Sequence, residues 1–422
     1  GGYGIFYAPP LHEGFNTLGY NRSTPLVGSF DGDLTPAARL QNPFPNGLLK
    51  PVGNSEGPLS GVGQNIQFID QNTGSLLVHQ FSIDMQRELP GNLAVMLGYV
   101  GSRSSHVSVG MGAININQLE PRHLPLGAQL LQQAENPFFG KGGSGVIAAQ
   151  RVTRSQLLRP FPQFGAVNLL MSGDNTAKYD SLVLRAQKRF SGNVSFITTY
   201  TWSKNMDGSF GAANQIASQP GALQNAYDLK AEYGLSTADV THRFSSGVSL
   251  ALPFGRGQRW LNGSRLLDLF VGGWQTHVVT LIQSGFPLAV VQAVNLNSAI
   301  GASLQRPNAT GQPPKTPGSV QERLDRFINP AAFANATQFT FGNTSRLLNV
   351  RAPGLHNWDI ALFKSFTLYE RLALQFRAEA LNAFNTPQFN RPNNAFGNPN
   401  FGTITSQLNF PRFVQFGARV HF

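Results

Sequence analysis

Seven charged side chains, six of them arginines, alternate with apolar neighbours along the chain. They are Arg185, Arg189, Arg243, Arg371, Arg377, Glu379 and Arg419. Arginines gathered on one wall of a cavity favour anionic solutes, because a cleft lined by one sign of charge concentrates counter-ions. The alternative is structural: arginines and a glutamate can pair in ladders along a wet wall or contact a domain held inside it. The pattern predicts that these residues face a lumen and leaves both roles open.

No motif for covalent or metal chemistry accompanies these charges. Cysteine is absent, and the eight histidines show neither H-x-H nor H-E-x-x-H spacing, so no catalytic residue, metal or cofactor is predicted. The run GVSLA (247–251) misses the G-x-S-x-G pattern, and FGKGGSG (139–145) lacks the spacing of a phosphate-binding loop. DGD (31–33) and MSGDN (171–175) could lend oxygens to Ca²⁺ but lack the full ladder of Asp and Asn ligands. We therefore expect a protein that is not an enzyme.

The segments that must position the charges repeat a two-residue alternation, which is the period of β-strands. In the last twelve residues, PRFVQFGARVHF, the apolar positions are Val414, Phe416, Ala418, Val420 and the terminal Phe422. Similar runs lie at 1–8, 75–88, 92–102, 179–190, 193–204, 242–252, 271–283, 356–367 and 370–384. Ten strands are predicted, most of about 11 to 14 residues, where strands of soluble proteins average about 5 to 6.

The predicted connections alternate in length. Tight turns are expected at 89–91, 191–193 and 368–370, and 253–270 is intermediate. Long links rich in Gly, Asn and Pro are expected at 9–73, 103–176, 206–240, 284–355 and 385–411. Counted back from the C-terminus, every long link falls at one rim of the sheet and every tight turn at the other. This is the pattern of an outer-membrane barrel, and we predict an all-β, antiparallel transmembrane β-barrel in the bacterial outer membrane.

A barrel wall in lipid gives the aromatic residues separate roles. The apolar positions of the last strand are predicted to face lipid, with Phe422 at the interface where aromatic girdles form. Tyr99, Trp202, Trp274 and Trp358 also lie on apolar faces and are expected in that girdle. Aromatic residues of the long links are freer to bind a ligand, and the candidates are Phe138, Phe139, Phe339 and Phe341.

The charge balance does not indicate a nucleic-acid partner. The net charge is +11, but the Lys and Arg residues are scattered along the chain, whereas nucleic-acid binders gather them in one patch. No nucleic-acid binding is therefore predicted.

An ordered set of sequence blocks resembles the C-terminal barrel of TonB-dependent receptors of the Oar-like type. These receptors carry a carboxypeptidase-regulatory-like domain and are abundant in Acidobacteria. The blocks include GGYGIFY (1–7), YDSLVLRAQKRFSGNVSFITTYTWSKNMD (179–207), DVTHRFSSGVSLALPFGRGQRW (239–260) and LQFRAEALNAFNTPQFNRPN (374–393). The alternating C-terminus with its final Phe also resembles the signal that the barrel insertion machinery reads.

The resemblance implies a barrel of about 22 strands, which belongs to the plugged class, and places all of residues 1–422 in its C-terminal portion. The plug domain and the TonB box of the family are not found in these residues, so an open sheet of about ten strands is expected. The implied partners are outer-membrane lipid and lipopolysaccharide, the barrel insertion machinery, the TonB complex through an N-terminal part, and a bulky solute bound by long extracellular loops. A structural or adhesive barrel without active transport and a soluble carbohydrate-binding module remain as alternatives.

Overall fold

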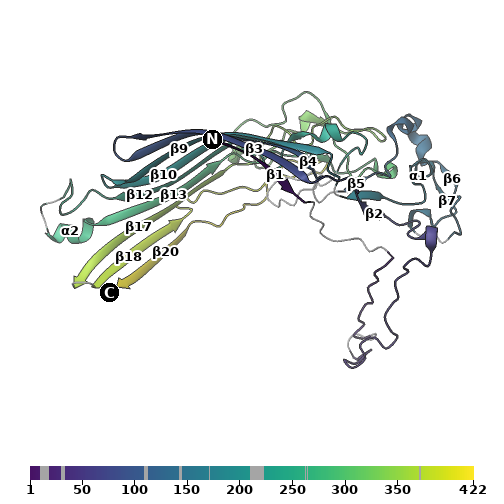
Figure 1. Ribbon diagram of the computed structural model, residues 1–422, viewed down its shortest axis with the longest axis horizontal. Coiled ribbons are helices and arrows are strands. Elements are labelled where there is room, and N and C mark those ends of the chain that lie inside the picture. Colours follow the sequence, from purple (N-terminus) through teal and green to yellow (C-terminus); the bar gives the residue numbers. More distant parts are fainter. Residues whose placement is uncertain are drawn as a thin grey trace.

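The computed structural model describes residues 1–9, 19–29, 34–108, 113–141, 145–170, 172–209, 223–261, 263, 265–369 and 372–422. One antiparallel sheet dominates it and contains ten long strands that pair in chain order (Figure 1). These are β1 (Gly2–Ala8), β3 (Leu76–Leu89), β4 (Leu93–Val107), β9 (Asn175–Ser191), β10 (Val194–Asp207), β12 (His242–Ala251), β13 (Trp274–Gln283), β17 (Leu355–Tyr369), β18 (Leu372–Leu381) and β20 (Phe413–His421). The predicted all-β class and its ten strands are confirmed.

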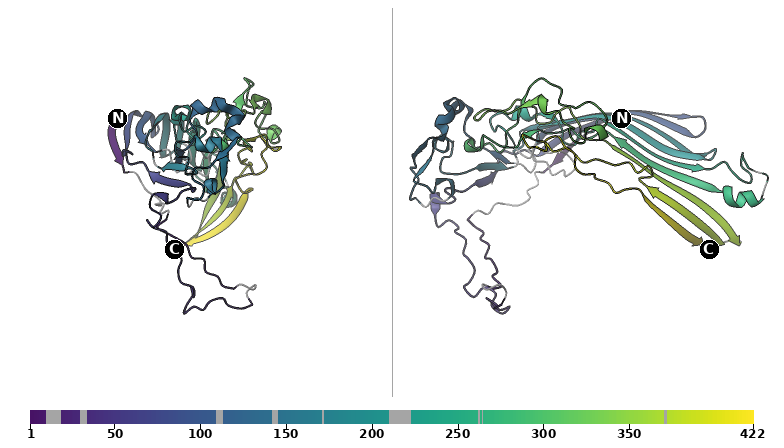
Figure 2. Two further views of the ribbon diagram at one scale, coloured as in Figure 1. Left: turned by 90° about the vertical axis from the view of Figure 1, so that its right-hand side faces the viewer. Right: turned by 180° about the vertical axis from the view of Figure 1, so that it is seen from behind.

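The sheet is curved, with β1 and β20 at the two ends of the strand order (Figure 2). Among the described residues no pairing joins these two strands, so the sheet is open, as predicted.

The registers place all tight turns at one rim and all long links at the other. Leu89 pairs with Leu93 across one turn, and Ser191 pairs with Val194 across the next. Positive φ angles of 57° at Gly192 and 69° at Asn193 are the left-handed conformations that a two-residue hairpin turn requires. The long links 9–75, 108–174, 208–241, 284–354 and 382–412 all leave the opposite rim, as the sequence predicts.

Several predicted strand boundaries differ from the observed ones. The strand expected at 92–102 runs on to Val107, and the strand expected at 179–190 begins at Asn175. Two other boundaries are wrong for local reasons. The strand expected at 370–384 ends at Leu381, because Asn382 and Asn385 adopt φ angles of 47° and 52° and turn the chain. The strand expected to begin at 271 begins at Trp274. Helix α2 (Arg265–Val271) precedes it, since the apolar residues of RLLDLFV follow a helical spacing.

Strand pairing joins the apolar positions of neighbouring strands into continuous rows. One row crosses six strands through Phe196, Val248, Val278, Ile360, Ala380 and Val414. Because side chains alternate along each strand, these rows define an apolar face of the sheet, and the opposite side is its polar face. The apolar face matches the surface expected to meet lipid.

Most of the long links pack into a second body at their rim, here called the loop layer, whereas part of the link 9–75 projects away from it (Figure 1). The strands of the loop layer are β2 (Ile66–Ile69), β5 (Ala113–Asn115), β6 (Gln133–Glu135), β7 (Arg151–Thr153), β8 (Val167–Leu170), β14 (Val291–Gln292), β15 (Asn308–Ala309), β16 (Phe333–Ala334) and β19 (Ala395–Phe396). The short strand β11 (Gly234–Leu235) belongs to the main sheet, where it pairs with the end of β10. The helices of the long links are α1 (Arg154–Leu157) and short 3₁₀ turns at Gly57–Leu59, Pro121–Leu131, Gly145–Ile147, Leu229–Glu232, Ser298–Ile300, Gln321–Arg323 and Pro330–Ala332. None of the described helices is long and apolar enough to cross a membrane.

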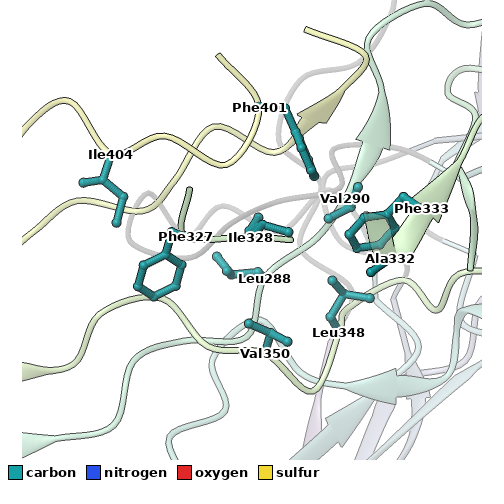
Figure 3. Packing of buried hydrophobic residues seen from close by; sticks show 10 residues of the cluster. All are labelled: Leu288, Val290, Phe327, Ile328, Ala332, Phe333, Leu348, Val350, Phe401 and Ile404. Carbon is teal, nitrogen blue, oxygen red and sulfur yellow. The ribbon is translucent and has the colours of Figure 1, made fainter. Parts of the chain in front are cut away.

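The fully buried apolar side chains of the described chain lie in this layer. The largest cluster joins the links 284–354 and 382–412 (Figure 3), and it consists of Leu288, Val290, Phe327, Ile328, Ala332, Phe333, Leu348, Val350, Phe401 and Ile404. A second cluster contains Leu119, Leu130, Ile300, Ala302 and Phe339. The long links therefore fold against one another and fix the shape of the rim.

Candidate functional site

The predicted lumen residues share the polar face of the sheet. Those within the described chain are Arg185, Arg189, Arg243, Arg377, Glu379 and Arg419, and Arg371 lies outside the described residues. Their cross-strand neighbours are mostly polar: Arg185 pairs with Thr199, Arg243 with Thr201, and Arg419 with Gln375. The sheet thus brings these side chains to one surface.

An arginine–glutamate ladder, one of the alternatives for these charges, is not seen within the described part of this face. Glu379 accepts a hydrogen bond from Gln415 Nε2 rather than from an arginine. Arg377 Nε donates to Gln375 Oε1 at 2.9 Å, and its guanidinium carbon lies 5.3 Å from the Phe363 ring centroid. The described arginines of this face form no ion pair within 4.0 Å with a described carboxylate. The carboxylates that share the face are Asp84, Glu88, Asp359 and Glu379. The role of the arginines towards a solute stays a prediction.

The four loop aromatics separate into two pairs. Phe139 is 52% exposed and Phe138 is half-buried, so both rings are open to a ligand. Phe339 is only 7% exposed and belongs to the second core cluster, and Phe341 packs against that cluster. The expectation that the rings of Phe339 and Phe341 are free to bind a ligand is therefore wrong. Both rings pack in or against a core that forms between distant links, and local composition does not show such contacts.

The C-terminal strand presents its apolar positions as expected. Val414, Phe416, Ala418 and Val420 pair with Ala380, Ala378, Phe376 and Leu374 of the same face. The rings of Phe376 and Phe416 stack with centroids 6.2 Å apart, and Phe422 is 99% exposed. The proposed part of Phe422 in assembly is a separate prediction.

Buried ion pairs tie the link 208–241 and the end of β10 to the link 284–354. Arg306 Nη1 donates to Glu232 Oε2 at 2.9 Å, and both side chains are at most 5% exposed. Arg346 Nη2 donates to Asp207 Oδ1 at 2.8 Å, and its Nε donates to the Glu232 carbonyl at 2.8 Å. Arg351 binds the fully buried Asp239. These contacts hold the rim above the middle strands in one arrangement.

Two neighbouring pockets open where the loop layer meets the sheet. The larger, of about 750 Å³, is lined by Tyr99, Asp180, Ser181, Leu182, Trp202, Ser203, Lys204, Met206, Leu235, Thr241, Ser345, Leu347, Asn349 and Arg351. The smaller, of about 570 Å³, has a floor formed by the cross-strand row Tyr200, Phe244, Ile282 and His356. Asn349 and Arg351 line both. Tyr99, Trp202 and the floor row belong to the apolar face, so both pockets open mainly on that face.

The smaller pocket has a cationic lining. Lys315, Arg323 and Arg351 contribute to it, and none of its described lining residues is acidic. Arg323 Nη1 donates to the Thr316 carbonyl at 3.1 Å, and its guanidinium carbon lies 4.3 Å from the Phe327 ring centroid. Burial lowers the pKa of Arg323 below its ordinary value. An anionic group of modest size fits this lining.

The described residues contain no group of three His, Asp or Glu side chains close enough to hold a metal ion. Of the two segments considered for Ca²⁺, residues 31–33 and Met171 lie outside the described part of the chain.

The sequence prediction missed the pockets but contained a signal for them. Lys178, Asp180 and Lys204 continue the alternation of the apolar face beyond Leu182 and Trp202. Charges at the end of an apolar row indicate where that row leaves lipid and meets polar surroundings.

Comparison with known proteins agrees with the architecture. Residues 1–415 match a protein family described as an outer membrane beta barrel domain. No relative was found among curated protein sequences. Similar solved structures include the outer membrane transporter YddB from Escherichia coli, with 8% identity and a TM-score of 0.40 over 86% of this chain and 35% of that one. Another is the FrpB iron transporter from Neisseria meningitidis, with 12% identity and a TM-score of 0.35 over 85% and 32%. The chain spans about a third of the length of these structures.

Proposed function

Since the chain belongs to the family of outer membrane beta barrel domains and lies in the bacterial outer membrane, we propose that it is the C-terminal wall of a TonB-dependent transporter of the Oar-like, acidobacterial type. In this proposal the plug domain and the TonB box lie upstream of residue 1. The loop layer forms the extracellular rim, and the polar face lines the path of a bulky solute. The protein binds and passes its solute without breaking bonds, and contacts the TonB complex through its N-terminal part.

The observation that supports this function best is the set of arginines on the polar face. The described members of this set, Arg185, Arg189, Arg243, Arg377 and Arg419, form no ion pair within 4.0 Å among the described residues. A wall that needed charges only for its own stability would pair them with carboxylates. Unpaired guanidinium groups in a confined, wet lumen attract anions. We therefore propose a solute that carries negative charge.

The proposal is tested by uptake in cells that carry the full-length gene or its deletion. Labelled acidic peptides, acidic oligosaccharides and anionic metal chelates are supplied with and without a protonophore. Uptake of at least one class should require the gene and should stop when the proton-motive force is removed. The triple variant Arg185→Gln, Arg377→Gln, Arg419→Gln should lower this uptake by about tenfold, since each replacement removes an exposed charge worth roughly 0.5 kcal/mol at an anion, or about 1.5 kcal/mol for the three.

Arg122→Gln serves as the matched control, because Arg122 is an exposed loop arginine paired with Glu120 at 2.7 Å, away from the polar face. It should leave uptake unchanged. If no solute depends on the gene, or if the protonophore has no effect, active transport is refuted. A loss of attachment to surfaces in the same deletion strain would then favour a structural or adhesive barrel.

A further inference from the structure

The larger pocket combines an apolar floor with a charged end. Tyr99, Leu182 and Trp202 form one cross-strand row on the apolar face, and Leu347 of the loop layer also lines the pocket. Its volume of about 750 Å³ falls within the range of about 300 to 1,000 Å³ typical of ligand sites.

Cations gather directly above this row, on the side of the long links. Asp180 pairs across the sheet with Lys204, and Lys178 pairs with Arg103. Arg103 Nη2 lies 2.8 Å from Asp180 Oδ1 and Lys178 Nζ lies 3.4 Å from Asp180 Oδ2, so one carboxylate serves two cations. Lys204 is exposed and forms no ion pair among the described residues. Arg351 is bound to Asp239. The four cations Arg103, Lys178, Lys204 and Arg351 are therefore accompanied by only two carboxylates, Asp180 and Asp239.

The order of side chains along these strands follows the depth profile of a lipid leaflet. Leu97, Leu184 and Tyr200 form one row, Tyr99, Leu182 and Trp202 form the next, and the charged residues follow. Aliphatic side chains suit acyl chains, Tyr and Trp suit the interface, and Lys and Arg suit phosphate groups. This order occurs on the apolar face of an outer-membrane barrel, at the rim that carries the long links. The surface there faces the outer leaflet.

We propose that the pocket and its cationic end bind one phosphorylated glycolipid of the outer leaflet. An acyl chain lies over Tyr99, Leu182 and Trp202 beneath Leu347. A phosphate of the head group contacts Lys204 and Lys178. Arg103 is held in place by Asp180 and by the Phe81 ring, whose centroid lies 5.4 Å from its guanidinium carbon. The inference rests on the extracellular placement of the loop layer in the proposed function, but not on transport, since it concerns the opposite face of the wall.

The test uses purified full-length protein in a non-ionic detergent, titrated with hexa-acylated lipid A that carries two phosphates, with bound lipid counted by native mass spectrometry. The double variant Lys178→Glu, Lys204→Glu should bind at least tenfold more weakly, because each basic residue contributes measurably at an anionic lipid surface. Lys188→Glu is the matched control: Lys188 lies on the same strand and continues the same face at the tight-turn rim, where its Nζ donates to the Gly91 carbonyl at 2.7 Å. It should bind lipid A as the wild type does.

Further arms separate the possible sources of phosphate. Dephosphorylated lipid A should bind at least tenfold more weakly than the phosphorylated form, and Leu182→Trp, which fills the pocket, should weaken binding without removing the charges. Phosphatidylglycerol and inorganic phosphate should not displace lipid A at equal concentration. Equal binding of dephosphorylated lipid, an equal loss in Lys188→Glu, or displacement by either competitor would overturn the proposal. Heat-modifiable gel mobility of every variant confirms that the barrel is folded.

Discussion

Replacing Ala378 by arginine on the apolar face of β18 is expected to lower the free energy of unfolding by about 2–4 kcal/mol. Ala378 pairs with Phe416 on one side and with Leu362 on the other, so both directly paired neighbours of the new charge are apolar. β18 has ten residues, a length of about 34 Å at roughly 3.4 Å per residue. A tilt of about 40° projects this length to about 26 Å, close to the height of a barrel's apolar band. Ala378 lies near the middle of that height, where a charge costs most.

Two further variants of the same strand isolate the cause. Leu374→Arg places the charge nearer the tight-turn rim, roughly 6.5 Å from the middle by the same geometry against roughly 4 Å for Ala378, so its cost should be smaller than that of Ala378→Arg. Arg377→Leu changes the polar face instead and removes one hydrogen bond to Gln375. It should cost no more than about 1 kcal/mol.

The free energies are measured by guanidinium unfolding of the full-length protein in lipid vesicles, followed by heat-modifiable gel mobility. The expected order of damage is Ala378→Arg, then Leu374→Arg, then Arg377→Leu. Equal damage from Ala378→Arg and Arg377→Leu would show that both faces lie in similar surroundings, and the assignment of the apolar face to lipid would be wrong.

Three other outcomes follow from the site geometry. Deletion of Phe422 should leave the protein in the periplasm, and normal levels in outer-membrane fractions would contradict a role in assembly. Phe339→Ala should destabilise the loop layer by about 3 kcal/mol, measured by hydrogen exchange, whereas Phe139→Ala should leave it unchanged. Hydrogen bonds from the backbone N–H and the hydroxyl of Ser319 lower the pKa of Glu322 below 4.5, so the stability that Glu322 contributes is present above that pH and is lost as the pH falls through the lowered pKa. Ser319→Ala should raise this pKa in a ¹³C carboxyl titration, and an unchanged value would refute the hydrogen-bond explanation.

The strands were predictable because their signal is local. An alternation such as that of Val414, Phe416, Ala418 and Val420 requires only neighbouring residues, and the same alternation assigns Arg419 to the polar face. The sorting of turns and links follows from strand lengths and chain order. Even the turn at Asn193 carries a local signature, since Gly-Asn favours the left-handed conformation. The sheet and its two faces could therefore be predicted without knowing any distant contact.

The loop layer was not predictable, because its contacts join residues far apart in the sequence. Phe339 lies in a Gly- and Asn-rich link, and its burial depends on Leu119 and Leu130, more than two hundred positions away. Arg346 resembles an ordinary loop arginine until the fold brings it to Asp207 and Glu232. Neither residue belongs to a periodic pattern. Composition indicated long loops, but it did not indicate that they would share a core or form pockets on the apolar face.

The buried pair of Arg306 and Glu232 shows what keeps these links together. Among the described atoms, Glu232 Oε1 and Arg306 Nε have no hydrogen-bond partner, so the pair is only partly compensated for its loss of water. Arg306→Met would leave the buried carboxylate unpaired and should destabilise the loop layer by about 3–5 kcal/mol.

The double variant Arg306→Met, Glu232→Leu removes both charges and should be near the wild type or more stable, because an apolar pair of similar volume avoids the desolvation cost. Hydrogen exchange of residues 223–241 and 285–354 measures the loop layer, and the strands β9 and β10 provide an internal reference that should keep their protection in every variant. If the double variant is as unstable as Arg306→Met, the pair is needed for more than mutual neutralisation. The contact of Glu232 with Arg346 would then be the next contact to test, because the Glu232 carbonyl accepts a hydrogen bond from Arg346 Nε at 2.8 Å. A shift of the segment around Glu232 would break both this hydrogen bond and the ion pair with Arg306.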